Sequence, residues 1–214
     1  RRRLMNNRWM IFQGNVLTRM NPFWTVITEG KEKIDPGQAY VIVPNHQSML
    51  DIVVFNELRH RLRWISKIEI FKVPLLGWEM KMVKYIKLER GNKHSVVRMM
   101  EECIESLRDG ISIVIFPEGT RSLTGEIGRF KTGAFQLAVK TDKPILPVLI
   151  DGTGDILPKH GIIFRNRRVV RIRVLDPIFP GQFDTGDPEQ LAVRVHDMMA
   201  LALDDLRGRQ ENKK

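Results

Sequence analysis

Short apolar segments rich in β-branched residues alternate with longer amphipathic segments along most of this chain. The short segments predict strands over 39–43, 62–66, 84–88, 111–116 and 144–150, with a basic strand-like segment at 162–174. The longer segments predict helices near 47–59, 94–108, 130–140 and 187–207. Strands that alternate with helices at this spacing favour a largely parallel sheet. We therefore expect an α/β fold with a largely parallel central sheet flanked by helices.

The first 27 residues have a different pattern. Apolar side chains recur there at spacings of three and four, at Trp9, Phe12, Val16 and Met20. With the arginines around them they predict an amphipathic helix, either docked on the domain or lying in a membrane interface. We expect residues 1–27 to form an N-terminal amphipathic membrane-associating segment, and residues 28–214 to form one α/β domain. No apolar run approaches the roughly 18 residues needed to span a bilayer. Because the chain begins with Arg1, we also expect further sequence upstream.

The charge balance predicts an anionic partner. The 214 residues include 35 Lys and Arg against 25 Asp and Glu, which gives a net charge of +10. Such a charge suits a nucleic acid, an anionic bilayer, or an acidic substrate or carrier. The chain lacks the aromatic strand, zinc-finger spacing and helix-turn-helix that mark nucleic-acid binders, so we expect no nucleic acid. The alternating arginines from Arg165 to Arg173 form either a solvated strand face or a membrane-binding one.

Neither a metal nor a bound cofactor is expected. The five histidines are scattered and Cys103 is the only cysteine, so no metal-ligand spacing appears and no internal disulfide can form. The glycine patterns that cradle nucleotide phosphates are also missing.

Two polar clusters come directly after two of the predicted strands. Residues 45–51 read Asn-His-Gln-Ser-Met-Leu-Asp after strand 39–43, and residues 116–122 read Phe-Pro-Glu-Gly-Thr-Arg-Ser after the strand that begins at 111. In open α/β sheets, ligands bind beyond the carboxyl ends of the strands. The two clusters therefore predict one shared site.

The first cluster offers an acid–base pair. His46 lies at a strand end and Asp51 lies five residues further on. A carboxylate bound to one imidazole nitrogen fixes the tautomer and leaves the other nitrogen free to accept a proton. The alternative is that Asp51 caps or pairs locally and His46 is an ordinary loop residue. Ser48 is either a nucleophile or, as its position before a helix favours, an N-cap.

The second cluster offers groups that bind an anion. Glu118, Thr120 and Arg121 surround Gly119, which permits a tight turn or a close approach to a ligand. An arginine can grip a phosphate with two parallel hydrogen bonds. Lys131 lies at the start of a predicted helix, whose N-terminal amides also favour anions. The alternative is a charged surface turn.

These residues resemble the PlsC-type glycerolipid acyltransferases. The run Asn-His-x4-Asp at 45–51 matches the first sequence block of that family and residues 116–122 match the third. Residues 87–90, Lys-Leu-Glu-Arg, look like the second block, with Glu89 where the commoner form has Asp. Residues 146–148 look like the fourth block, and residues 131–134 fit the segment that usually comes after the third. The resemblance extends over about residues 28–175.

The resemblance implies a membrane-bound 1-acyl-sn-glycerol-3-phosphate acyltransferase of phospholipid biosynthesis. Such an enzyme moves an acyl chain from acyl-CoA or an acidic acyl carrier protein to the sn-2 hydroxyl of lysophosphatidate, giving phosphatidate. We expect it at the cytoplasmic face of a membrane, peripheral or monotopic, with a bacterial inner membrane as the expected setting. The alternatives are a related enzyme with another lysophospholipid or glycerol-phosphate acceptor, and a non-catalytic basic lipid-binding module.

The resemblance also assigns roles to residues. His46 would remove the proton of the acceptor hydroxyl, and Asp51 would orient and stabilise the imidazole. The substrate-binding residues would be Arg90, Glu118, Gly119, Thr120, Arg121 and Lys131. Among these the cations would hold the acceptor phosphate, and Glu118 would position the acceptor or orient the arginines.

Overall fold

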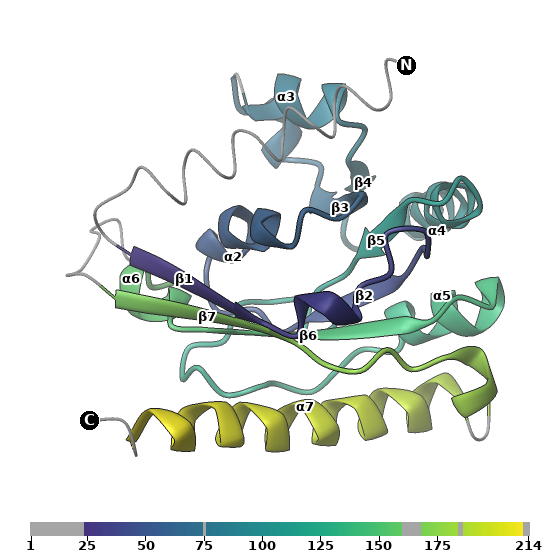
Figure 1. The fold of residues 1–214 in the computed structure, drawn as a ribbon. Helices are drawn as coiled ribbons and strands as arrows, with labels where there is room; N and C mark the ends of the chain where they lie inside the picture. Colours follow the sequence, from purple (N-terminus) through teal and green to yellow (C-terminus); the bar gives the residue numbers. More distant parts are fainter. Residues whose placement is uncertain (1–23, 75, 160–167, 184–185, 212–214) are drawn as a thin grey trace.

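The computed structural model describes residues 24–74, 76–159, 168–183 and 186–211 (Figure 1). One sheet contains β1 Trp24–Glu29, β2 Val41–Pro44, β3 Leu62–Lys67, β4 Ile86–Leu88, β5 Ser112–Val114, β6 Ile145–Asp151 and β7 Arg168–Val174. The strand order is β1-β7-β6-β2-β5-β3-β4. Strands β6, β2, β5, β3 and β4 run parallel, whereas β7 is antiparallel to β6 and parallel to β1. The expected largely parallel α/β fold is confirmed.

Helices cover both faces of the sheet (Figure 1). The α-helices are α2 Leu50–Val54, α3 Leu76–Met82, α4 Lys93–Arg108, α5 Gly133–Thr141, α6 Thr153–Ile156 and α7 Pro188–Glu211. Short 3-10 turns are η1 Lys31–Lys33, η2 Phe55–Leu58, η3 Ile70–Lys72 and η4 Pro180–Gln182. Helices α4, α5 and α7 pack on one face, and α2 and α6 pack on the other. Helix α3 lies on the α2 side of the sheet, opposite α7 (Figure 1).

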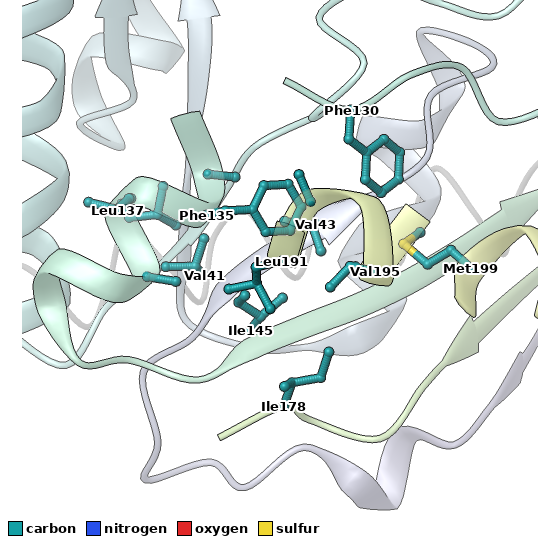
Figure 2. Close-up of a cluster of buried hydrophobic side chains, with 14 of the residues drawn as sticks. Val41, Val43, Phe130, Phe135, Leu137, Ile145, Ile178, Leu191, Val195 and Met199 are labelled. Atoms are coloured by element: carbon teal, nitrogen blue, oxygen red, sulfur yellow. The ribbon is translucent and has the colours of Figure 1, made fainter. Parts of the chain in front are cut away.

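The core is built by the alternation of side chains along the strands. In β2, Val41 and Val43 belong to the cluster with α5 and α7, whereas Ile42 belongs to the cluster on the opposite face. All three are fully buried. Figure 2 shows Val41 and Val43 packed close to Phe135 and Leu191. A strand buried on both faces reads as a continuous apolar run, which is why this strand was predictable from sequence.

Strand β1 was not predicted. It begins at Trp24, so residues 24–27 belong to the sheet and not to the N-terminal helical segment in which we expected them. The strand pairs with β7 from Trp24 opposite Arg168 to Glu29 opposite Arg173. Since this partner lies about 140 residues away, the local pattern carries no sign of the pairing. The amphipathic helix expected before it lies outside the described residues.

Two element boundaries differ from the predictions in ways that shape the site. The helix predicted near 47–59 begins only at Leu50, and its second half is the 3-10 turn η2. The strand predicted over 111–116 ends at Val114. Both polar clusters therefore begin in loops beyond the carboxyl ends of neighbouring strands. Among the helices that the structure describes, none is long and apolar enough to cross a membrane.

Candidate active site

The two polar loops meet where β2 and β5 end side by side. The Ser122 amide donates to the His46 carbonyl at 2.7 Å, and the His46 amide donates to Oε1 of Glu118 at 2.8 Å. These contacts cross more than seventy residues of sequence and bring the two clusters into one place, as their positions after two strands predicted.

His46 and Asp51 form a direct pair. Nδ1 of His46 lies 2.7 Å from Oδ2 of Asp51, and the Asp51 side chain is fully buried. The same oxygen accepts from the amides of Gln47 at 2.8 Å and Ser48 at 2.9 Å. Because this oxygen already accepts from two amides, Nδ1 is the donor in its contact with Asp51, which leaves Nε2 as the acceptor.

Thr153 completes the shell around Asp51. Its hydroxyl donates to Oδ1 of Asp51 at 2.5 Å from the start of α6. The chain reaches this position through Gly152, whose φ of 91° suits glycine, and a Cβ there would lie 2.6 Å from the Val169 carbonyl oxygen. Sequence reasoning missed Thr153, because a threonine 102 residues from its partner gives no local signal.

A row of two stacked aromatic rings, Phe116 and Trp64, fixes the plane of the His46 imidazole. The rings of His46 and Phe116 stack with centroids 3.7 Å apart and planes 15° apart. Phe116 in turn stacks on Trp64 of β3, with centroids 5.3 Å apart. The row and the bond to Asp51 together fix both the plane and the rotation of the catalytic candidate.

Glu118 fastens the two loops together. Its carboxylate accepts from the His46 amide and, through Oε2, from the Gly128 amide at 3.0 Å. Burial raises the pKa of the Glu118 carboxyl above its ordinary value, and the two backbone hydrogen bonds oppose that shift. These contacts give Glu118 a scaffolding role that its sequence context did not predict.

Gly119 lets cations approach the turn. Its φ is 68°, and a Cβ there would lie 2.8 Å from Nζ of Lys131. On the same turn, Nη2 of Arg90 donates to the Gly119 carbonyl at 2.5 Å. Arg90 and Lys131 were both predicted as site residues, and the structure brings both to the turn beside Glu118.

Lys159 is a further cation that the sequence did not reveal. Its Nζ donates to the Thr120 hydroxyl at 3.1 Å and to the Arg121 carbonyl at 2.8 Å. Lys159 lies eight residues beyond the end of β6 and belongs to none of the recognised sequence blocks, so only the fold places it here.

The cations of this turn have no acidic partner among the residues that the structure describes. We call Arg90, Arg121, Lys131 and Lys159 together the anion-binding cluster. Within the described parts of the chain, no carboxylate forms an ion pair with any of these four residues. Arg90, Lys131 and Lys159 bring three positive groups to this turn, and Arg121 is a residue of the turn itself. Like charges this close repel one another, and a bound anion relieves the repulsion. The cluster therefore suits a phosphate, and it lies next to the His46 loop.

Other candidates have structural roles. Ser48 is fully buried, and its hydroxyl donates to the Leu157 carbonyl at 2.7 Å and accepts from the Leu50 amide at 3.2 Å. The N-cap position of α2 is Met49, so Ser48 closes the turn before the helix and does not cap it. Arg173 is buried between Glu29 and Asp205, so this arginine of the basic run faces neither solvent nor a membrane. Arg165 and Arg167 lie outside the described residues.

Comparisons with known proteins identify similar sequences and a similar fold. A family model described as Acyltransferase matches residues 25–151. The chloroplastic 1-acyl-sn-glycerol-3-phosphate acyltransferases of Brassica napus and Arabidopsis thaliana are each 38% identical over 164 residues, or 76% of this chain. These matches cover 48% and 46% of the plant proteins, so the chain spans about half their length. The crystal structure of the 1-acyl-sn-glycerophosphate acyltransferase PlsC from Thermotoga maritima is similar with a TM-score of 0.82, at 29% identity, covering 94% of this chain and 79% of that one.

Proposed function

Since this chain belongs to the acyltransferase family, we propose that it transfers an acyl chain from a thioester to the sn-2 hydroxyl of lysophosphatidate and forms phosphatidate. The observation that carries the proposal is a fixed His–Asp pair whose loop is bonded to a turn that three cations reach, Arg90, Lys131 and Lys159, none of which has an acidic partner among the described residues. Lysophosphatidate has a hydroxyl to be deprotonated and a phosphate to be bound, a short distance apart in one molecule.

The reaction begins with proton transfer to His46. Nε2 of His46 takes the hydroxyl proton as the hydroxyl oxygen attacks the thioester carbonyl. The tetrahedral intermediate then breaks its carbon–sulfur bond, and the thiolate receives the proton from the imidazolium, so the enzyme returns to its starting state. Asp51 stabilises the transient imidazolium through the 2.7 Å contact at Nδ1. A thiolate is a good leaving group, so no metal or cofactor enters the proposal.

The anion-binding cluster holds the acceptor phosphate. In this proposal Arg121 provides a fork that matches two phosphate oxygens. Arg90 and Lys131, which both reach the Gly119 turn, add further positive groups. Lys159 holds the Thr120 hydroxyl and the Arg121 backbone, which keeps the turn in its binding shape. Glu118 positions this turn without contacting the substrate, because its carboxylate accepts a hydrogen bond from the His46 amide.

The donor is either acyl-CoA or acyl carrier protein, and the net charge of +10 suits both, because each carrier is anionic. We place the reaction at the cytoplasmic face of a membrane, where lysophosphatidate resides. The amphipathic segment before Trp24 supports this placement through its sequence alone.

The test is a matrix of donors and acceptors. Purified protein is incubated with acyl-CoA or acyl carrier protein as donor, and with lysophosphatidate, lysophosphatidylcholine or glycerol 3-phosphate as acceptor. Mass spectrometry of the lipid products should show phosphatidate as the main product, and Arg121→Ala should lower its formation. Efficient acylation of lysophosphatidylcholine with no phosphatidate would identify a different acceptor, and no turnover with any pair would contradict an enzymatic function.

A further inference from the structure

The connection between β3 and β4 is a compact unit with a defined outer side. Helix α3 packs on η3, where the Gly77 amide donates to the Val73 carbonyl at 2.8 Å. Phe71 and Met80 are buried, and η3 contacts strand β3 of the sheet. The backbone bond from Tyr85 to the Met80 carbonyl, at 3.0 Å, closes it before β4.

The outer side combines one large apolar ring with ammonium groups. Trp78 is 65% exposed and Val73 is 47% exposed. Lys81 lies one turn after Trp78 on α3, so the two side chains share a side of the helix. We define the α3 surface as these three residues together with the other exposed lysines on this side of the unit, which are Lys72, Lys84 and Lys87.

The α3 surface lies close to the candidate active site. Strands β3 and β4 run parallel to β5, so they end at the edge of the sheet where the His46 and Glu118 loops meet. Arg90, two residues beyond the end of β4, donates to the Gly119 carbonyl. A ligand bound to a surface on this connection would therefore lie near the anion-binding cluster.

We propose that the α3 surface binds the anionic face of a lipid bilayer, as a contact separate from residues 1–23. An exposed indole suits the headgroup layer, where its ring meets glycerol and acyl carbons and its N–H meets polar groups. Each surrounding ammonium group is attracted to lipid phosphates. The inference deepens the proposed function, since a bilayer supplies the lysophospholipid acceptor to a site beside this surface.

Position in the bilayer is tested with a fluorescent probe on the full chain. Trp78→Cys is labelled with an environment-sensitive fluorophore, and the native Cys103 does not compete because it is buried. Vesicles that contain phosphatidylglycerol should shift the emission to the blue, whereas vesicles of phosphatidylcholine alone should shift it far less. The matched control is Leu201→Cys on α7, which is 73% exposed and lies on the opposite side of the sheet (Figure 1). A blue shift at Leu201 and none at Trp78 would overturn the proposal.

Affinity is tested by vesicle co-sedimentation. Trp78→Ala should lower the partition coefficient on anionic vesicles about tenfold, which corresponds to the free energy gained when one large apolar side chain is buried. The double variant Lys81→Gln, Lys84→Gln should lower it about 20- to 30-fold on anionic vesicles and little on neutral ones. Leu201→Ala and Lys140→Gln, both at exposed positions, should bind as the wild type does. Wild-type vesicle binding by all variants, with loss of binding to an acidic acyl carrier protein instead, would assign the surface to that protein.

Turnover separates this inference from the proposed function. Trp78→Ala should keep wild-type turnover on a short-chain, water-soluble lysophosphatidate, and its turnover on vesicle-bound lysophosphatidate should fall in proportion to its about tenfold lower partition coefficient. A wild type that binds anionic vesicles through Trp78 without acylating either substrate would count against the proposed function alone. Full turnover of Trp78→Ala on vesicles would count against the α3 surface alone.

Discussion

Replacement of Asp51 by Asn isolates the charge of the buried carboxylate. The carboxylate accepts from Nδ1 of His46, two backbone amides and the Thr153 hydroxyl. An amide of the same shape can place its oxygen at the Oδ2 position, where three of these donors meet. Its NH2 group then faces the Thr153 hydroxyl, which can reverse and accept. The hydrogen-bond geometry therefore survives the substitution, and the negative charge does not.

The cost in stability should be small. Charge-assisted hydrogen bonds are roughly twice as strong as neutral ones, so the four bonds together lose about 3–4 kcal/mol. The neutral amide is also cheaper to bury than a carboxylate, which offsets much of this loss. We expect a net destabilisation of about 1–2 kcal/mol, which lowers Tm by about 2–8 °C for a chain of this size.

The cost in catalysis should be large. The imidazolium formed during proton transfer loses its counter-charge, so kcat should fall by about 10²–10⁴-fold while the acceptor KM changes little. The assay follows thiol release from the acyl thioester with lysophosphatidate as acceptor. Asp155→Asn is the matched control, because Asp155 is an exposed carboxylate on the neighbouring helix α6. Wild-type kcat in a correctly folded Asp51→Asn protein would refute the role given to the pair.

Further substitutions test the rest of the site. Thr153→Val removes the donor to Oδ1 of Asp51 and should lower the unfolding free energy in urea by about 1.5–3 kcal/mol, whereas Thr153→Ser, which keeps the hydroxyl, should lose far less. Arg121→Ala should lower kcat/KM for lysophosphatidate by about 10²-fold, and Arg121→Lys should restore little, because a point charge cannot form the fork; an effect on the donor KM alone would move Arg121 to the carrier. Because the folded-state pKa of Glu118 is raised, the native state holds that proton more tightly than the unfolded state, so this group's contribution to stability falls as pH rises from the ordinary glutamate pKa through the raised one. The measurement is the urea midpoint of wild type and of Glu118→Gln across that pH range. The wild-type midpoint should fall relative to that of the variant as pH rises, and a pH-independent difference would contradict the raised pKa.

The sequence predicted what local pattern can encode. The apolar strands were visible because their residues are buried on both faces. The spacing of His46 and Asp51 left their contact open, and the family resemblance assigned Asp51 to orient His46, with which it is in contact in the structure. Strand β1 and the side chains of Thr153 and Lys159 were missed, since each depends on a partner far away in the chain. Glu118 was predicted to position the acceptor or orient the arginines, and only the structure shows its carboxylate accepting from two backbone amides.

The most direct test of the proposed function is the rate of phosphatidate formation by His46→Ala beside the wild type. Both proteins are given saturating acyl thioester and lysophosphatidate, and His94→Ala is the control, because His94 is an exposed histidine on α4. We predict that His46→Ala loses about 10²–10⁴-fold in kcat with an unchanged fold by circular dichroism, while His94→Ala keeps the wild-type rate. Comparable rates for wild type and His46→Ala would contradict the assignment of His46 as the base.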